Sequence, residues 1–266
     1  MKKILLLCVL VIFSCSGGDD SSYSNNDNND NNNNDNNNSE LLNCDGNPVP
    51  TIVYGTQEWT VENACHITYR DGTPIPEVRN ISDWRGLNTG AWCYYDNNIN
   101  NGVLYNWYAV VGIHNAASFT DTSLRKEFAP EGWHIPSDAE WTTLEEYLIA
   151  NGYNYDETTE GNKIAKAISS QSGWLSNSST DFGNPGYNQE NTNNSSGFNI
   201  PPVGKRYSYA SNTWDFNGQG NDADVWTSTQ HSDGLAFYRN LHTNDVSINR
   251  YYAQSGQGFS VRLVKD

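Results

Sequence analysis

The chain has 266 residues, which is enough for one large domain or two small ones. Hydrophobic residues make up 36% of it and aromatic residues 12%, so we expect a folded domain whose lean core depends on rings with a polar group. The net charge is −16, because 31 Asp and Glu oppose 15 Lys and Arg. This charge disfavours binding to phosphate backbones, so we expect no nucleic-acid partner.

The N-terminus has the pattern of a signal peptide. Lys2 and Lys3 precede an apolar run over residues 4–13, which is too short to cross a bilayer as a helix. Residues 12–15 resemble a bacterial lipobox, in which the cysteine, here Cys15, becomes the lipidated first residue of the mature chain. We therefore expect the membrane to be a partner through a lipid anchor. The alternative is ordinary signal cleavage, with the cysteine incidental.

A polar segment follows the lipobox. Residues 25–38 contain 11 Asn and 3 Asp, a composition that cannot bury a core. We therefore divide the chain into a signal peptide with its anchor cysteine (1–15), a disordered tether (16–43) and one domain (44–266). Residues 16–20 resemble the acidic export signal of bacterial surface lipoproteins, which implies an outer-membrane protein exposed at the cell surface.

Three cysteines fall within or beside the expected domain: Cys44, Cys65 and Cys93. An odd number in an oxidising compartment favours one disulfide and one spare thiol. We predict that Cys65 pairs with Cys93, because both flank the same aromatic segment while Cys44 lies near the tether. The three possible pairings remain open at this level. The five histidines are dispersed and no CxxC pair occurs, so a zinc site has no support in the sequence.

One helix is clearly marked. Ser137 and Glu140 form an S-x-x-E capping box, and the sequence ends the helix with an Asn-Gly stop at residues 151–152. Between them an apolar face is set by Trp141, Leu144 and Leu148. These signals predict a helix over residues 138–150, with Glu145 and Glu146 on a solvated face. A second helix is expected over 161–169.

Strand signals lie at both ends of the domain. Residues 52–54 and 58–61 predict an early hairpin, and turn residues near 233–234 and 244–245 separate later strands. The expected late strands are 225–229, 235–241, 246–251 and 259–264. Residues 170–221 are dominated by Gly, Asn, Ser and Pro and predict long irregular loops. The fold class is therefore α+β, with two helices and a small, late antiparallel sheet.

The densest group of oxygen ligands lies at residues 215–224. It resembles the start of a calcium loop, but Trp226 stands where an EF-hand has a bidentate Glu. Calcium is the only cofactor candidate, and a polar turn is the alternative. The candidate metal ligands are Asp215, Asn217, Asp222 and Asp224.

An indole beside amide side chains is suited to stacking on a sugar ring. We therefore assign ligand binding to Trp214, Asn217 and Asn221, within an expected binding region over residues 183–224. Arg239 and Arg262 are expected to pair with carboxylates. Five other tryptophans are expected in the core: Trp59, Trp107, Trp133, Trp141 and Trp226.

Several segments together resemble the Fibrobacter succinogenes major paralogous domain family. The resemblance covers roughly residues 50 to 266 and rests on residues 60–63, 69–76, 89–95, 104–110, 132–141, 226–229 and 258–262. It implies a lipoprotein or secreted protein of a fold similar to C-type lectins and formylglycine-generating enzymes. Many members have cysteines where this chain has Ala129 and Leu263, so a disulfide between those positions is excluded.

The resemblance does not imply catalysis. Formylglycine-generating enzymes need a reactive cysteine pair late in the chain, and no cysteine follows Cys93. The sequence also lacks G-x-S-x-G, H-E-x-x-H, P-loop and G-x-G-x-x-G motifs. We expect a non-catalytic lipoprotein whose domain binds glycan or protein at the cell surface. The alternatives are an assembly subunit of a surface complex and an enzyme acting on surface polysaccharide.

Overall fold

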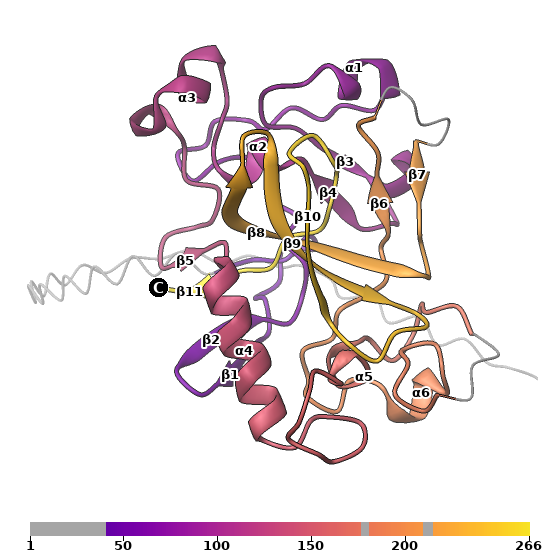
Figure 1. The fold of residues 1–266 in the computed structure, drawn as a ribbon. Coiled ribbons are helices and arrows are strands. Elements are labelled where there is room, and N and C mark those ends of the chain that lie inside the picture. Colours follow the sequence, from indigo (N-terminus) through magenta and orange to yellow (C-terminus); the bar gives the residue numbers. More distant parts are fainter. Residues whose placement is uncertain (1–40, 177–180, 210–214) are drawn as a thin grey trace, which may run out of the picture. The chain divides into compact units, whose positions relative to one another are not determined.

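The computed structural model of the chain describes residues 41–176, 181–209 and 215–266 (Figure 1). These residues form short helices and several small antiparallel sheets, which are joined by long loops. This mixture confirms the α+β class. Among the described residues, no helix is both long and apolar enough to cross a membrane.

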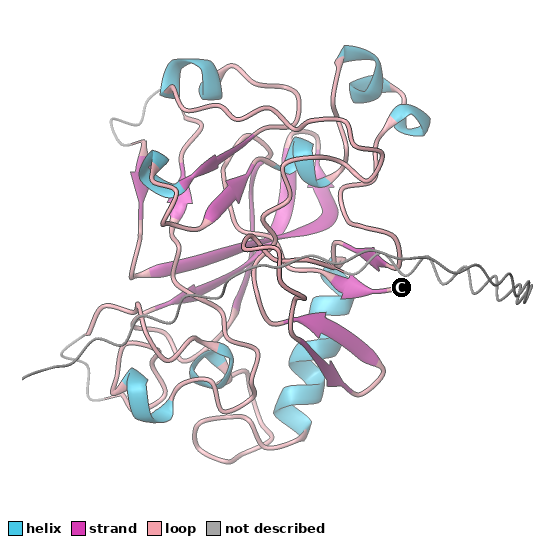
Figure 2. Cartoon of the chain, turned by 180° about the vertical axis from the view of Figure 1, so that it is seen from behind, coloured by secondary structure: helices cyan, strands magenta, loops and turns pink. Residues whose placement is uncertain are grey.

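The N-terminal hairpin belongs to a four-stranded sheet. Strands β1 (Thr51–Tyr54) and β2 (Gln57–Thr60) pair as predicted, around a turn in which Gly55 has a φ of 62°. Strand β11 (Val264–Lys265) lies between β2 and β5 (Trp133–His134) in the order β1-β2-β11-β5. Strand β11 therefore completes the sheet that β1 and β2 begin, more than 200 residues earlier in the sequence (Figures 1 and 2).

Helix α4 (Asp138–Ala150) confirms the prediction at both ends. Both halves of the capping box form: the Ser137 hydroxyl accepts from the Glu140 N–H, and the Glu140 carboxylate accepts from the Ser137 N–H. The predicted apolar face is buried, so the helix packs beside the β1–β2 hairpin (Figure 1). The second predicted helix is much shorter than expected, since only α5 (Ala165–Ile168) forms.

Three late strands form a second sheet in the order β10-β9-β8. Their bounds are Asp222–Ser232 for β8, Leu235–His242 for β9 and Asn249–Gln254 for β10. The predicted turn at 233–234 joins β8 to β9, with φ of 72° at Gly234. The predicted strand over 259–264 is wrong except for Val264, because residues 259 and 260 make isolated bridges to Tyr105 and Val225 instead.

Short elements fill the remaining described chain. Strand β3 pairs with β4, and β6 pairs with β7. The bounds are α1 Ile81–Arg85, β3 Trp92–Tyr94, η1 Tyr95–Asn97, β4 Val103–Tyr105, α2 Trp107–Val110, α3 Ala116–Thr120, η2 Thr122–Leu124, α6 Gln189–Thr192, β6 Lys205–Arg206 and β7 Phe216–Asn217.

The core is rich in indole rings, as the composition predicts. All five tryptophans assigned to it are buried, and Trp59 packs edge-to-face on Trp141 at a centroid distance of 5.0 Å. The indole N–H of Trp226 donates to the Tyr105 carbonyl. Rings with a polar group thus fill much of the interior, and some of them, such as Trp226, also donate a hydrogen bond to the buried backbone.

The disulfide prediction is wrong: the structure joins Cys44 to Cys65, and Cys93 is a buried free thiol. The physical reason is that the packed domain begins earlier than predicted. Leu41 is buried, and its carbonyl accepts from the Val49 N–H, so residues 41–43 belong to the domain and not to the tether. This short loop brings Cys44 beside Cys65, while β3 holds Cys93 inside the core.

Candidate functional site

The predicted calcium ligands meet cations of the protein itself. The ammonium of Lys205 lies 3.2 Å from an oxygen of Asp222 and 2.9 Å from one of Asp224. Burial raises the pKa of Asp224, although Lys205 opposes that shift. Asp215 forms a separate ion pair, at 2.8 Å, with Arg206. The four residues therefore do not form the calcium site that the sequence predicted.

The remaining predicted site residues are not brought together by the structure. Asn217 is exposed in β7, and Asn221 is half-buried just before β8. Trp214 and Cys15 lie outside the described residues. In the described ranges no three His, Cys, Asp or Glu side chains form a group that could hold a metal ion.

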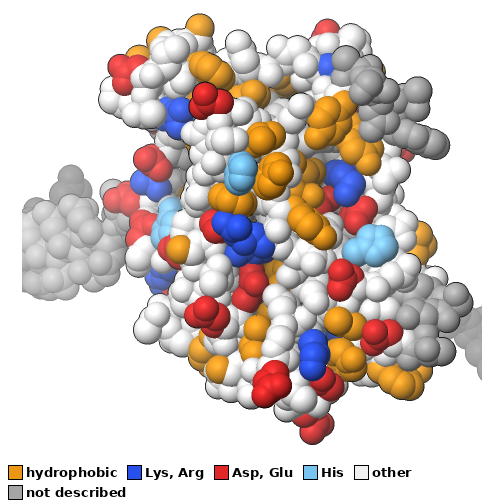
Figure 3. Space-filling view, in the orientation of Figure 1, with side chains coloured by type: hydrophobic (Ala, Val, Ile, Leu, Met, Phe, Trp, Pro, Cys, Tyr) orange, Lys and Arg blue, Asp and Glu red, His pale blue; other side chains and the backbone are white. Residues whose placement is uncertain are grey.

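A different surface, on the β8–β10 sheet, gathers exposed aromatic rings. We call it the aromatic platform and define it as His231, Phe237, Arg250 and Tyr252. The rings of His231 and Tyr252 are stacked, with centroids 4.1 Å apart and an interplanar angle of 16°. Tyr252 remains 56% exposed, although that stack covers one face of its ring. Figure 3 shows hydrophobic side chains over these strands beside basic and histidine side chains.

Strand register explains the platform. Tyr252 is opposite Phe237 across the β10–β9 pair, and Arg250 is opposite Arg239. Because side chains alternate between the faces of a sheet, residues two apart share one face. His231 is the extra residue of an irregularity in β8, where Gln230 pairs with Ala236 but Ser232 pairs with Leu235. Such a bulge re-aims a side chain, here against the Phe237 ring at 4.9 Å.

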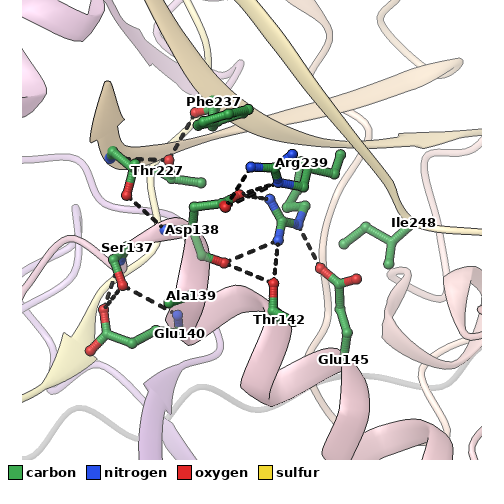
Figure 4. Close-up of polar contacts among 12 residues, drawn as sticks. Ser137, Asp138, Ala139, Glu140, Thr142, Glu145, Thr227, Phe237, Arg239 and Ile248 are labelled. Carbon is green, nitrogen blue, oxygen red and sulfur yellow. Dashed lines mark hydrogen bonds and ion pairs between the residues drawn. The ribbon is translucent and has the colours of Figure 1, made fainter. Parts of the chain in front are cut away.

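An ion-pair network fixes the sheet to the start of α4 (Figure 4). Buried Arg239 reaches Asp138 at 2.6 Å and Glu145 at 2.5 Å. Arg250 binds both oxygens of Asp138, and its guanidinium carbon lies 3.8 Å from the Phe237 ring centroid. The platform arginine is therefore held at one end by a carboxylate and on one face by an aromatic ring, which orients it in advance of any ligand.

Burial and arginine contacts act in opposite directions on the two carboxylates. Burial would raise the pKa of Asp138, but hydrogen bonds from Arg250 and Arg239 outweigh it and lower that pKa. For Glu145 burial prevails and raises the pKa despite Arg239. The prediction of a solvated Glu145 is therefore wrong, and both acids are engaged in ion pairs rather than positioned as a pair for acid–base chemistry.

The two arginines assigned to carboxylates have different partners. Arg239 confirms the expectation. Arg262 contradicts it: its guanidinium donates to the side chain of Asn63 and to the carbonyls of Thr60, Phe198 and Asn199. Burial lowers the pKa of Arg262 to about 9. Arg262 is thus a buried residue that ties the end of β2 to the loop at residues 198–199 through their backbone carbonyls.

Sequence reasoning missed the platform, although one signal was present. Arg250, Tyr251 and Tyr252 are consecutive, and two tyrosines on an edge strand leave one ring on each face of the sheet. The bulge that places His231 depends on pairing with β9 and has no signature in the sequence.

Comparison with known proteins identifies the family of this chain. The model of the Fibrobacter succinogenes major domain matches residues 52–265. No curated protein matches, and no solved structure does either. The match spans the four-stranded sheet, α4 and the three-stranded sheet that carries the platform. The chain therefore belongs to the Fibrobacter succinogenes major domain family.

Proposed function

We propose that this domain is a non-catalytic binding module that holds glycan on the aromatic platform at the cell surface. The observation that carries the proposal is the exposed His231–Tyr252 stack beside the preorganised guanidinium of Arg250. Sugar rings present an apolar face to an aromatic ring and hydroxyls to polar groups at its edge. The platform offers both kinds of contact on one surface.

The exposure of the platform rings is informative because most other large aromatic rings are buried. Every tryptophan among the described residues is buried, whereas His231 and Tyr252 are exposed. Clustered exposed apolar surface in a soluble domain is typical of a binding site. Asp138 and Glu145 are both held in ion pairs with Arg239, which does not suit them to act as the acid and base of a hydrolysis. These ion pairs therefore favour a binding role for this surface.

The proposal includes a C-type-lectin-like fold and a lipid anchor at Cys15. The fold is supported by the resemblance of the Ser137–Glu140 helix entry and of the Gly258-to-Arg262 segment to those folds. The location is supported by the lipobox and by the Asn-rich segment after it. Metabolic labelling with a fatty acid, followed by membrane fractionation, should label the wild type and not the Cys15→Ser variant.

The test of binding compares glycan-array signals of the wild type and a Tyr252→Ala variant. Loss of one stacking ring should weaken binding by about fivefold, since an aromatic contact contributes roughly 1 kcal/mol beyond its buried area. The matched control is Tyr209→Ala, because Tyr209 is also a partly exposed tyrosine but follows β6 rather than lying in the β8–β10 sheet.

Two outcomes would contradict the proposal. Equal glycan signals from the wild type and Tyr252→Ala would remove the platform from the site. Absence of any glycan signal, together with capture of a surface protein that depends on Tyr252, would favour protein binding or assembly.

A further inference from the structure

A pocket separate from the platform lies between the segment after α4, helix α5 and the loop that carries α6. Its volume is about 330 Å³. It shares no residue with the platform. Its main lining residues are Tyr153, Asn154, Tyr155, Lys166, Phe182 and Tyr187. Four aromatic rings thus surround one lysine, in a space of the size that small-molecule sites have.

Lys166 is an unusual cation because it is buried without a carboxylate. The residue is 6% exposed, and its ammonium donates to the carbonyls of Asn184 and Tyr187. The ammonium also lies 5.6 Å from the centroid of the Tyr187 ring. No described carboxylate forms an ion pair with it. Burial lowers the pKa of Lys166 to about 8, the direction expected for an uncompensated charge.

A buried charge normally has a counter-charge, because desolvating an ion alone is costly. The lysines elsewhere in the described chain follow that rule: Lys126, Lys163, Lys205 and Lys265 all contact carboxylates. Lys166 is the exception among the described lysines, and it lies in the wall of an aromatic pocket.

We propose that this pocket binds a small organic acid, with the carboxylate on Lys166 and the ring of the acid between the aromatic walls. Two of the three ammonium N–H groups are used by carbonyls, so one donor and one positive charge remain. A carboxylate matches this site, because it carries one negative charge and its oxygen can accept the remaining N–H. A phosphate group would need several convergent donors, which a single lysine does not supply.

The acid could be an acidic sugar or an aromatic acid, since both carry a ring and a carboxylate. Isothermal titration of the full-length protein with D-glucuronate and with phenylacetate separates these two sources. Glucose and benzyl alcohol serve as the neutral counterparts. We expect one of the two acids to bind at a single site and its neutral counterpart to bind about tenfold more weakly or worse.

The matched variants are Lys166→Met and Lys163→Met. Lys166→Met should weaken binding of the acid by about tenfold or more, because the charge is lost while an unbranched side chain one atom shorter is kept. Lys163→Met should bind as the wild type does, since Lys163 pairs with Asp156 outside the pocket lining. Tyr155→Ala removes one wall without touching the ammonium and should also weaken binding, which keeps the test usable if Lys166→Met fails to fold.

The proposal is overturned if neither acid binds, or if folded Lys166→Met binds the acid as tightly as the wild type. The result is independent of glycan binding on the platform, because Tyr252→Ala leaves the pocket intact. An acid that binds Tyr252→Ala and the wild type equally would support the pocket even if the platform bound no glycan.

Discussion

The imidazole Nε2 of His134 lies 2.7 Å from Oε1 of Glu140, the residue that closes the capping box of α4. The other ring nitrogen lies 2.7 Å from a carboxylate oxygen of Asp266. Burial alone would lower the pKa of His134, but hydrogen bonds with Glu140 and Asp266 outweigh it and raise the pKa. One side chain thus links β5, the start of α4 and the residue after β11.

This link predicts a pH dependence of stability. Because the folded pKa of His134 is raised, its stabilisation is fully present below the unfolded pKa of about 6.5 and is lost as the pH rises through the folded value. The urea midpoint of the wild type should therefore fall over that window relative to His134→Gln. Parallel profiles for the wild type and His134→Gln would refute the prediction.

The arginine network predicts a contrast between two variants. Arg239→Met removes the buried cation and leaves the Glu145 carboxylate, whose side chain is 14% exposed, without it, which should lower the free energy of unfolding by about 3–5 kcal/mol. Arg250→Met removes a half-exposed partner of Asp138 and should cost about 1 kcal/mol or less. Denaturant unfolding measures both, and equal costs would mean that burial does not set the importance of these pairs.

The cysteines predict a distinctive chemical pattern. Peptide mapping without reduction should recover Cys44 joined to Cys65, and Cys65→Ser should cost roughly 3 kcal/mol of stability through the loop that the bond closes. Burial raises the pKa of Cys93 to about 12, so a maleimide should label it only after unfolding. Rapid labelling of Cys93 in the native protein would contradict this assignment.

The Lys205 ion pairs predict the response to calcium. Millimolar calcium should leave the melting temperature of the wild type unchanged, because the Lys205 ammonium already contacts the oxygens of Asp222 and Asp224 that would have to bind the ion. Lys205→Met should be destabilised by about 3–5 kcal/mol at neutral pH and recover part of that as the pH falls and the carboxylates protonate. Lys265→Met, which breaks an exposed pair with Glu58, is the matched control and should cost about 1 kcal/mol or less. A calcium-dependent rise in the wild type would restore the predicted site.

Local signals predicted the local structure well. The capping box at Ser137 and Glu140 gives the start of α4 because its hydrogen bonds join residues only three apart, and the Asn-Gly stop at 151–152 gives the end. The early hairpin and the turn at 233–234 were predictable for the same reason.

Long-range structure was harder to predict. The partner of Cys65 depends on how residues 41–49 fold back, and the partners of Arg262 are backbone carbonyls far along the chain. The acidic loop was misread because a single sequence does not show that Lys205 would lie between its carboxylates. The platform needs both the β9–β10 register and the β8 bulge, neither of which composition specifies.

The position of β11 bears on when the domain can fold. Its two residues lie between β2 and β5, so the four-stranded sheet cannot close until almost the whole chain has been synthesised. Early segments must wait for contacts more than 200 residues away, such as that between Val264 and Trp59. Such non-local closure slows folding. The four-stranded sheet is therefore expected to close late in folding, after the contacts that are local in the sequence have formed.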